Sequence, residues 1–361
     1  MNFQVTQENL AKALNSVARV ANTKNTLPIL SNIMIKTIGT RVSISATNLD
    51  IAITHFIGSK VSEEGSITVP AKLMQDFISS LPSGIIELKL KENRLYIKTE
   101  QYKSIINGMS TDEFPVMPAI DKGMSWSLSS TVFKKGLQQV AFAASNDDTR
   151  PALTGIYLYT SDGKLYMAAT DSYRLAEKEL STTNKDIKLL IPASAAQDLL
   201  RIISDEEQNI NITHDDQQVL FKVGEIELVT RLIESKYPDY KKLIPNNFSS
   251  TAIIKKIDFL NIAKVSSLFA RESAGSITIE IKDSSISIQS IASQLGENTA
   301  KAQAVINGEG SITLNSRYLI DALQAFSDEE VEFCFNGKLE PCIVRGVKQI
   351  DYTHVIMPLK S

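Results

Sequence analysis

The sequence predicts an α+β fold made of three copies of one domain. First, a helical spacing of apolar residues occurs three times, at offsets of 123 and then 126 positions. Second, each helical segment is followed by two alternating segments with a short polar turn, which indicates an antiparallel hairpin. Third, a second helix begins at Pro or Asn in every third of the chain. A chain of 361 residues is long enough for three cores.

The first helix of each copy follows from its apolar spacing. Leu10, Leu14, Val17 and Ala21 predict a helix from about Gln7 to Ala21. The equivalent residues are Phe133, Leu137, Val140 and Ala144 in the second copy and Phe259, Ala263, Ser266 and Ala270 in the third.

The hairpins follow from period-two alternation. The predicted strand pairs contain residues 33–35 and 42–44, 156–158 and 165–167, and 277–279 and 286–288. Their turns are expected around Gly39, at Asp162-Gly163 and at Asp283-Ser284-Ser285. Alternation means that each hairpin buries one face.

The second helices begin near Pro70, Pro192 and Asn315. Two further strands follow each of them, and the copies end in FPVMP, YPDYKKLIP and YTHVIMP. With boundaries in polar stretches, the expected domains are 1–122, 123–249 and 250–361.

The composition is that of a globular protein whose overall charge does not favour nucleic acid. The formal net charge is −3, so any DNA-binding surface has to be local. No apolar run approaches the roughly 20 residues that span a bilayer, and the N-terminal residues lack a signal-peptide pattern, so no membrane association and a cytoplasmic location are expected. In that compartment Cys334 and Cys342 are expected to be free thiols.

Three motifs carry a resemblance to a known family. ATDSYRLA (Ala169 to Ala176) repeats ATNLD (Ala46 to Asp50) at an offset of 123, YPDYKKLIP ends the second copy, and VIMPLKS ends the third. In this order and at these separations they resemble the bacterial DNA polymerase III beta subunits, the sliding clamps, over the whole chain. The resemblance implies three clamp domains, each with two helices on antiparallel sheets. It further implies a head-to-tail homodimer that closes as a ring around duplex DNA, with twelve helices lining the hole.

The resemblance gives the helices a DNA-facing role. Such a ring holds phosphates without reading bases, which requires diffuse positive charge. The predicted helices carry eight cationic and five acidic side chains, a balance of 8 − 5 = +3, although a solvated helix face explains these charges as well. The implied DNA-binding residues are Lys12, Arg19, Lys24, Lys72, Lys134, Lys135, Arg201, Lys264 and Arg317.

The resemblance also implies a dimer interface and a peptide pocket. Closure would join the first domain of one subunit to the third of the other, with Ile106, Leu268 and Phe269 as candidates. The pocket would take apolar peptide anchors, with Arg174 and Lys242 orienting the polar part. Its residues would be Leu153, Thr170, Ser172, Tyr173, Arg174, Leu175, Pro238, Lys242, Leu243, Tyr318, Leu339, Pro341, Val355, Ile356, Met357, Pro358 and Leu359. Some relatives carry Gly-His in place of Ser172-Tyr173, and Lys242 replaces a frequent Arg.

The partners implied by the resemblance are proteins that handle DNA. They are the replicative alpha-type polymerase subunit, the clamp loader, other DNA polymerases, mismatch repair proteins and ligase, each bound through a short peptide. The clamp itself would need no cofactor, because ATP is used by the loader.

Two other function classes compete with a clamp. An enzyme is disfavoured, because His55, His214 and His354 are scattered without metal-ligand spacing and no catalytic or metal site can be assembled from local motifs. A repeat scaffold that binds proteins without encircling DNA predicts the same repeats and pocket. It gives no reason for ring closure or for basic helix faces.

Overall fold

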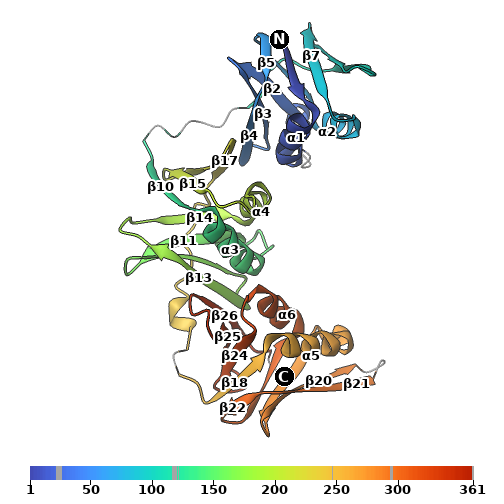
Figure 1. The fold of residues 1–361 in the computed structure, drawn as a ribbon. Coiled ribbons are helices and arrows are strands. Elements are labelled where there is room, and N and C mark those ends of the chain that lie inside the picture. Colours follow the sequence, from blue (N-terminus) through green and yellow to red (C-terminus); the bar gives the residue numbers. More distant parts are fainter. Residues whose placement is uncertain (22–26, 116–119, 121, 246, 293–295, 360–361) are drawn as a thin grey trace. The chain divides into compact units, whose positions relative to one another are not determined.

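The computed structural model describes residues 1–21, 27–115, 120, 122–245, 247–292 and 296–359 (Figure 1). Contacts divide the chain into two compact units: unit 1 contains Met1–Thr131 and Gln197–Leu232, and unit 2 contains Val132–Ala196 and Ile233–Ser361. The described part contains the helices α1 (Gln7–Ala21), α2 (Ala71–Ser80), α3 (Ser130–Val140), α4 (Ala193–Ile202), α5 (Lys256–Phe269) and α6 (Ser316–Ala325). The central copy is therefore divided between the two units.

Unit 1 contains two antiparallel sheets. The five-stranded sheet has the order β5 (Lys60–Glu63), β1 (Asn2–Thr6), β7 (Ile85–Lys91), β8 (Arg94–Lys98), β9 (Lys103–Asn107). The eight-stranded sheet has the order β10 (Met124–Ser129), β15 (Asn209–His214), β16 (Gln218–Val223), β17 (Ile226–Arg231), β4 (Ile51–Gly58), β3 (Arg41–Thr47), β2 (Asn32–Ile38), β6 (Ser66–Pro70). The pairing of β17 with β4 joins strands of the first and second copies.

Unit 2 also contains two antiparallel sheets. The nine-stranded sheet has the order β14 (Lys188–Pro192), β11 (Gly155–Ser161), β12 (Lys164–Thr170), β13 (Arg174–Thr182), β26 (Tyr352–Ile356), β25 (Cys342–Gly346), β24 (Glu330–Phe335), β18 (Ser250–Lys255), β22 (Val305–Asn307). The four-stranded sheet has the order β21 (Gly296–Gln303), β20 (Ser285–Ala292), β19 (Ser276–Lys282), β23 (Gly310–Asn315). Here β13 and β26 join the second and third copies.

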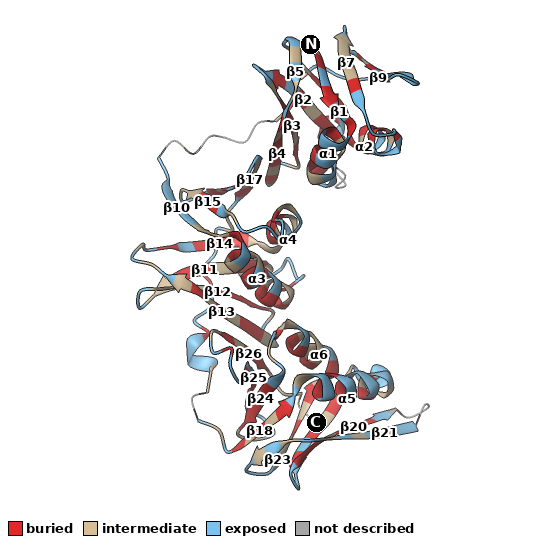
Figure 2. Cartoon of the chain, in the orientation of Figure 1, coloured by how far each residue is buried: buried red, intermediate tan, exposed pale blue. Residues whose placement is uncertain are grey.

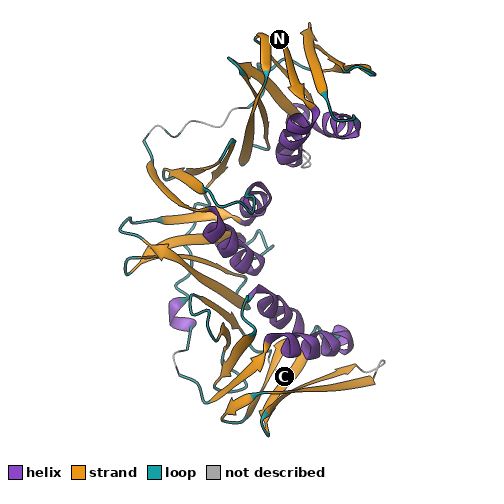
Figure 3. Ribbon diagram, viewed as in Figure 1, coloured by secondary structure: helices purple, strands orange, loops and turns teal. Residues whose placement is uncertain are grey.

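The helices cover one face of the sheets within each unit (Figure 3). In α1 the spacing that predicts the helix also selects its buried face, because Leu10, Leu14 and Val17 are fully buried against β3 and β4. Burying each such side chain contributes about 1.5–3 kcal/mol relative to exposure. Figure 2 shows the same alternation throughout, with buried residues toward the sheets and exposed residues on the outer helix faces.

The predicted hairpins are confirmed, with one correction at the third turn. Gly39 has a φ of +57°, and Asp162 and Gly163 have φ values of +51° and +74°, which two-residue turns require. In the third copy the turn consists of Asp283 and Ser284 alone, at +49° and +56°, and Ser285 already pairs with Lys282 in the sheet. The polarity of this serine does not distinguish a turn from a strand end.

The second helices begin where predicted, although Pro and Asn start them differently. Pro70 and Pro192 end the preceding strands, directly before α2 and α4, and have no amide proton that needs a partner. Asn315 is a true N-cap of α6, because its Oδ1 accepts a hydrogen bond from the Arg317 amide at 2.9 Å.

Candidate functional site

A pocket of about 160 Å³ lies in unit 2, beside the start of β13 and the end of β26. Its base is a strand pairing in which Leu175 stands opposite Val355. The residues that line the pocket are Leu153, Thr170, Ser172, Arg174, Leu175, Pro238, Tyr240, Leu243, Val355 and Met357. The ATDSYRLA motif, the end of the second copy and the end of the third copy therefore meet in one place.

The tight turn between β12 and β13 forms one wall of the pocket. The Asp171 Oδ1 atom accepts hydrogen bonds from the amides of Tyr173 at 2.9 Å and Arg174 at 3.0 Å. Thr170 Oγ1 donates to the Arg174 carbonyl at 2.6 Å and accepts from the Ser172 amide at 3.1 Å. This network holds Ser172 at a φ of +79°. The equivalent ATNLD turn holds Leu49 at +80° with the corresponding Thr47 and Asn48 bonds.

Arg174 is an internal residue whose guanidinium binds the protein itself. Its side chain is 10% exposed and bonds to Asp171 at 3.0 Å, to Asp321 of α6 at 2.7 Å and to the Phe142 carbonyl at 2.6 Å. The guanidinium carbon also lies 4.7 Å from the centre of the Tyr318 ring. These contacts join the strand that forms the pocket to a helix of the third copy, which fixes the position of the wall.

A tyrosine cluster supports the opposite wall. Tyr237, Tyr157, Tyr159 and Tyr166 stack in series, with ring centres 4.8, 4.7 and 5.5 Å apart. The Tyr240 hydroxyl donates to the Glu177 carboxylate, and the Tyr159 hydroxyl lies 2.7 Å from the Tyr240 hydroxyl and 2.9 Å from the same carboxylate, so it can donate to either. Burial raises the pKa of the Tyr240 hydroxyl far above its usual range, so it remains a donor.

The structure brings together nine of the seventeen predicted pocket residues and adds one that sequence reasoning missed. The addition is Tyr240, whose signal is its spacing from Tyr237 within YPDYKKLIP. The predicted residues that do not line the cavity are Tyr173, Lys242, Tyr318, Leu339, Pro341, Ile356, Pro358 and Leu359.

Three of those eight residues, Tyr173, Lys242 and Leu339, are exposed. Tyr173 and Leu339 are 58% and 72% exposed, and the Tyr173 carbonyl accepts a hydrogen bond from the Met357 amide at 2.8 Å. Lys242 is also exposed and forms an ion pair with Asp239 at 3.0 Å. Ile356, by contrast, is fully buried, because its position in β26 faces away from the pocket.

A basic groove of about 490 Å³ lies in unit 1 between α1 and α4. It brings together Lys12, Arg19 and Arg201, and Glu8 and Asp198 also line it. Arg201 pairs with Asp198 at 3.0 Å, and burial raises the pKa of that carboxyl although Arg201 and Arg19 oppose the shift. The groove therefore combines three predicted DNA-binding cations with two acids, of which Asp198 is paired with Arg201.

The other predicted cations lie on their expected helices, with one exception. Lys72 pairs with Asp76 on α2, and Lys135, Lys264 and Arg317 are exposed on α3, α5 and α6, as Lys134 partly is. Lys24 lies outside the described residues. Sequence counting missed Lys256 at the start of α5, but its ammonium donates to the Phe326 carbonyl at 2.8 Å.

The candidates for a dimer interface lie next to open sheet edges. Strand β9 is one edge of the five-stranded sheet, and β21 is one edge of the four-stranded sheet. Within β9, Ile106 is 5% exposed whereas its neighbour Ile105 is 54% exposed. The residue that points outward is therefore Ile105, which was not among the predicted interface residues. Leu268 is 51% exposed at the end of α5, and Phe269 is half-buried.

Two of the histidines, His55 and His354, and both cysteines are buried. His55 bonds to Ser16 Oγ at 2.8 Å, and burial lowers its pKa to about 4. Burial likewise lowers the pKa of His354 to about 3 and raises the pKa of the Cys334 thiol to about 12. Both cysteines are free and buried. Among the described residues, no three His, Cys, Asp or Glu side chains are grouped so as to hold a metal ion. Nor is any described helix long and apolar enough to cross a membrane.

Comparison with known proteins accounts for the whole chain. Family profiles of the DNA polymerase III beta subunit match residues 1–118 (N-terminal domain), 127–239 (central domain) and 241–360 (C-terminal domain). The Beta sliding clamp of Staphylococcus aureus is 30% identical over 375 residues, covering 100% of both chains. The chain belongs to the DNA polymerase III beta subunit family.

Solved structures agree with membership of the beta subunit family. The DNA polymerase sliding clamp of Bacillus subtilis has a TM-score of 0.96 at 26% identity, with 100% of this chain and 99% of that chain covered. The beta chain of DNA polymerase III from Streptococcus pneumoniae has a TM-score of 0.95 at 27% identity, with full coverage of both chains. Three clamp domains with helices on antiparallel sheets, as the sequence predicts, are thereby confirmed. The beta subunit is a non-catalytic processivity factor, in accordance with the expectation that the chain is not an enzyme.

Proposed function

We propose that the protein is a DNA sliding clamp: a homodimeric ring that encloses duplex DNA and tethers the replicative polymerase to it. The observation that carries this function is the full-length match to all three beta subunit domains. Processivity then comes from enclosure, so contacts with DNA can stay weak and sliding can stay fast. We place the domain boundaries near Lys122 and Ser249.

The sheet edges support closure into a ring. Strands β4, β13 and β21 occupy equivalent places in the three copies, and so do strands β9, β17 and β26. Inside the chain, a strand of the first set pairs with a strand of the second set twice, β4 with β17 and β13 with β26. The two strands left over, β21 of the third copy and β9 of the first, are both sheet edges. Pairing β21 of one subunit with β9 of the other would close a head-to-tail dimer, with Ile105, Ile106, Leu268 and Phe269 at the joint.

The helix faces support contact with the DNA backbone. In unit 1, Lys12, Arg19 and Arg201 meet in one groove. The proposed contacts are Lys12, Arg19, Lys24, Lys72, Lys134, Lys135, Arg201, Lys264 and Arg317. Cations distributed over several helices suit phosphates and provide no base-matching pattern, so binding is independent of sequence.

The unit 2 pocket supports docking of partner peptides. Leu175, Val355, Pro238 and Leu243 form an apolar site for Leu or Phe anchors, and Met357 adapts to different side chains. We assign to this pocket the peptides of the alpha-type polymerase subunit, clamp loader, other DNA polymerases, mismatch repair proteins and ligase.

The deciding experiment measures retention on DNA after loading. The protein should remain on circular duplex DNA in high salt and leave when one cut linearises the circle. Leu268→Asp should weaken closure and lower retention on circles, whereas Ile350→Asp, at a site that is 90% exposed and distant from both open edges in sequence, should not. Equal, salt-dependent loss from both DNA forms would refute enclosure, and absence of binding to either would favour a protein scaffold.

A further inference from the structure

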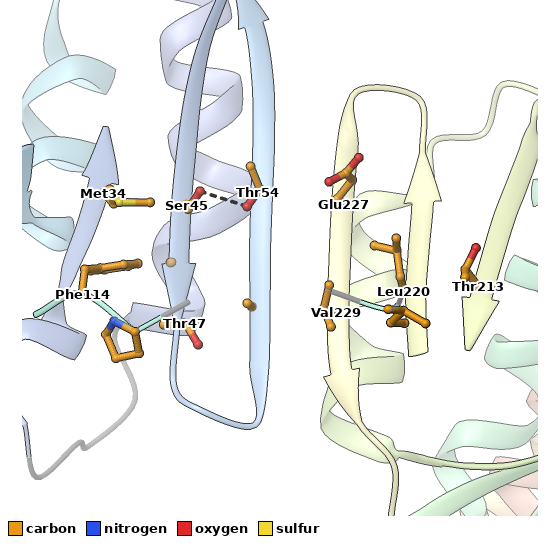
Figure 4. A pocket seen from close by; sticks show the side chains of 13 residues that line it. Met34, Ser45, Thr47, Thr54, Phe114, Thr213, Leu220, Glu227 and Val229 are labelled. Carbon is orange, nitrogen blue, oxygen red and sulfur yellow. Dashed lines mark hydrogen bonds between the residues drawn. The ribbon is translucent and has the colours of Figure 1, made fainter. Parts of the chain in front are cut away.

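A second pocket, of about 420 Å³, lies on the eight-stranded sheet of unit 1 where β4 pairs with β17 (Figure 4). It occupies the sheet face opposite α1, because Ala52 and Thr54 line it whereas the intervening Ile53 and the next residue, His55, are buried on the α1 side. In Figure 4 the side chains of Met34 and Phe114 face those of Leu220 and Val229 across it.

The strand pairing beneath this pocket repeats that beneath the unit 2 pocket. In unit 2, Leu175 pairs with Val355, and both line the pocket. In unit 1, Ala52 pairs with Val229, and both line the second pocket. The two pairs are related by the repeat offsets of 123 and 126 positions. The second pocket is thus the same joint between successive copies, one copy earlier in the chain.

Three further lining positions correspond at the offset of 123. They are Thr47 and Thr170, Pro115 and Pro238, and Ile120 and Leu243. The threonine has the same bonding in both copies, because its hydroxyl donates to the carbonyl four residues later, at 3.0 Å in one and 2.6 Å in the other. The local backbone that shapes a docking pocket in unit 2 is therefore present in unit 1.

Smaller side chains account for the larger volume of the second pocket. Met34, Phe114 and Thr54 stand where the central copy has Tyr157, Tyr237 and Glu177. In unit 2 the rings of Tyr157 and Tyr237 stack at 4.8 Å, and Glu177 accepts hydrogen bonds from two other tyrosines, Tyr159 and Tyr240. The tyrosine cluster fills space that remains open in unit 1. A volume of 420 Å³ lies within the roughly 300–1,000 Å³ of typical ligand pockets.

The charged lining residue of the second pocket has the opposite sign to that of the first, Glu227 in unit 1 and Arg174 in unit 2. Ile51 replaces Arg174 at the equivalent strand position, and Glu227 is the one ionisable side chain among the described lining residues. Its Oε1 atom accepts a hydrogen bond from Lys222 at 3.0 Å. A carboxylate accepts up to about four hydrogen bonds, so Glu227 can bind a second cation.

We propose that the unit 1 pocket is a second docking site, for an extended partner peptide in which a Leu or Phe anchor is flanked by Lys or Arg. The proposal rests on the proposed function, because the class of occupant follows from equivalence to the peptide pocket. The anchor contacts Phe114, Leu220 and Val229, and the flanking cation pairs with Glu227. Acidic peptides are excluded by the same carboxylate.

The test uses the full chain and two fluorescein-labelled peptides, Lys-Leu-Phe-Lys and Glu-Leu-Phe-Glu, followed by fluorescence anisotropy. Thr213→Trp fills the second pocket, and Thr213→Val is its matched control because both remove the 2.9 Å bond to Ser125. Leu243→Asp changes the unit 2 pocket at a side chain that is 58% exposed. A photoreactive leucine in the basic peptide reports the binding site in the unmodified protein, independently of any variant's folding.

The basic peptide should lose about tenfold in affinity with Thr213→Trp and about threefold with Glu227→Gln, and should change less than about twofold with Thr213→Val or Leu243→Asp. Its crosslinks should fall at Met34, Phe114 or Pro115, or within residues 41–54 or 213–229. Loss with Leu243→Asp and not with Thr213→Trp would overturn the second site while leaving the unit 2 pocket intact. No saturable binding of the basic peptide would also overturn it, and the circular-DNA experiment would still judge the clamp function separately.

Discussion

Arg174 is expected to stabilise unit 2 more than any exposed ion pair of the chain, and Arg174→Met tests this. The substitution keeps an apolar stem and removes the guanidinium with its bonds to Asp171, Asp321 and the Phe142 carbonyl. Asp171 is 14% exposed, so its charge would remain largely desolvated, whereas Asp321, at 27%, can recover some water.

The magnitude follows from that burial. Removing one partner of a buried ion pair costs about 3–5 kcal/mol, and the partial exposure of Asp321 places the expected loss near the lower end, at about 3 kcal/mol. Arg150→Met is the matched control in the same unit, because the Arg150–Asp147 pair is 43% and 44% exposed at 3.2 Å. Its loss should stay below about 1 kcal/mol.

The assay is urea unfolding followed by circular dichroism, together with hydrogen exchange over residues 174–178, a segment that leaves out Ser172 because Arg150 also donates to the Ser172 Oγ atom at 3.1 Å. Exchange in this segment should accelerate in Arg174→Met and remain close to that of the unmodified protein in Arg150→Met. Fluorescence of Trp126, the single tryptophan, reports on β10 in unit 1 and serves as an internal reference. Equal destabilisation by the two substitutions would contradict the inference that Arg174 is desolvated and fixes the pocket wall.

Three further predictions concern other parts of the chain. The pKa of His55 is about 4 in the folded chain, so the unfolded state binds more protons between that value and about 6.5. Stability should therefore fall as the pH drops through this window, and His55→Gln should flatten the slope of urea midpoints against pH. Cys334 and Cys342 should react with a thiol reagent slowly in the native protein and fully in urea, because burial raises both thiol pKa values; rapid native labelling would contradict this. Gly308→Ala should cost about 2 kcal/mol or more, since φ is +77° and a Cβ would lie 2.0 Å from the Ser249 carbonyl oxygen, whereas Gly337→Ala, with open space around it, should be tolerated in thermal unfolding.

Elements with a strong local pattern were predictable from the sequence. The first helix is confirmed from Gln7 to Ala21, because one apolar stripe both defines its period and buries its face. The hairpin turn at Asp162-Gly163 is set by residues that tolerate positive φ. In both cases the determining interactions lie within a few residues of one another, where a sequence pattern can report them.

Features that depend on distant pairing were not predictable. The partner of Arg174 in α6 is 147 residues away, and Asp321 has the pattern of an ordinary solvated helix residue. In β9 two isoleucines are adjacent, so alternation cannot decide which faces the core, and the structure buries Ile106 rather than Ile105. Tyr240 belongs to a cluster whose members come from three separated segments, and only folding brings them together.

The joints between copies are sheet pairings, and this has an evolutionary consequence. Backbone hydrogen bonds between β4 and β17, and between β13 and β26, hold neighbouring copies together independently of the peptide that connects them. Gene duplication and fusion could therefore change how many copies one polypeptide carries without changing the joint itself. Selection must then preserve the complementarity of the two strand edges, whereas the covalent connection between copies can change independently.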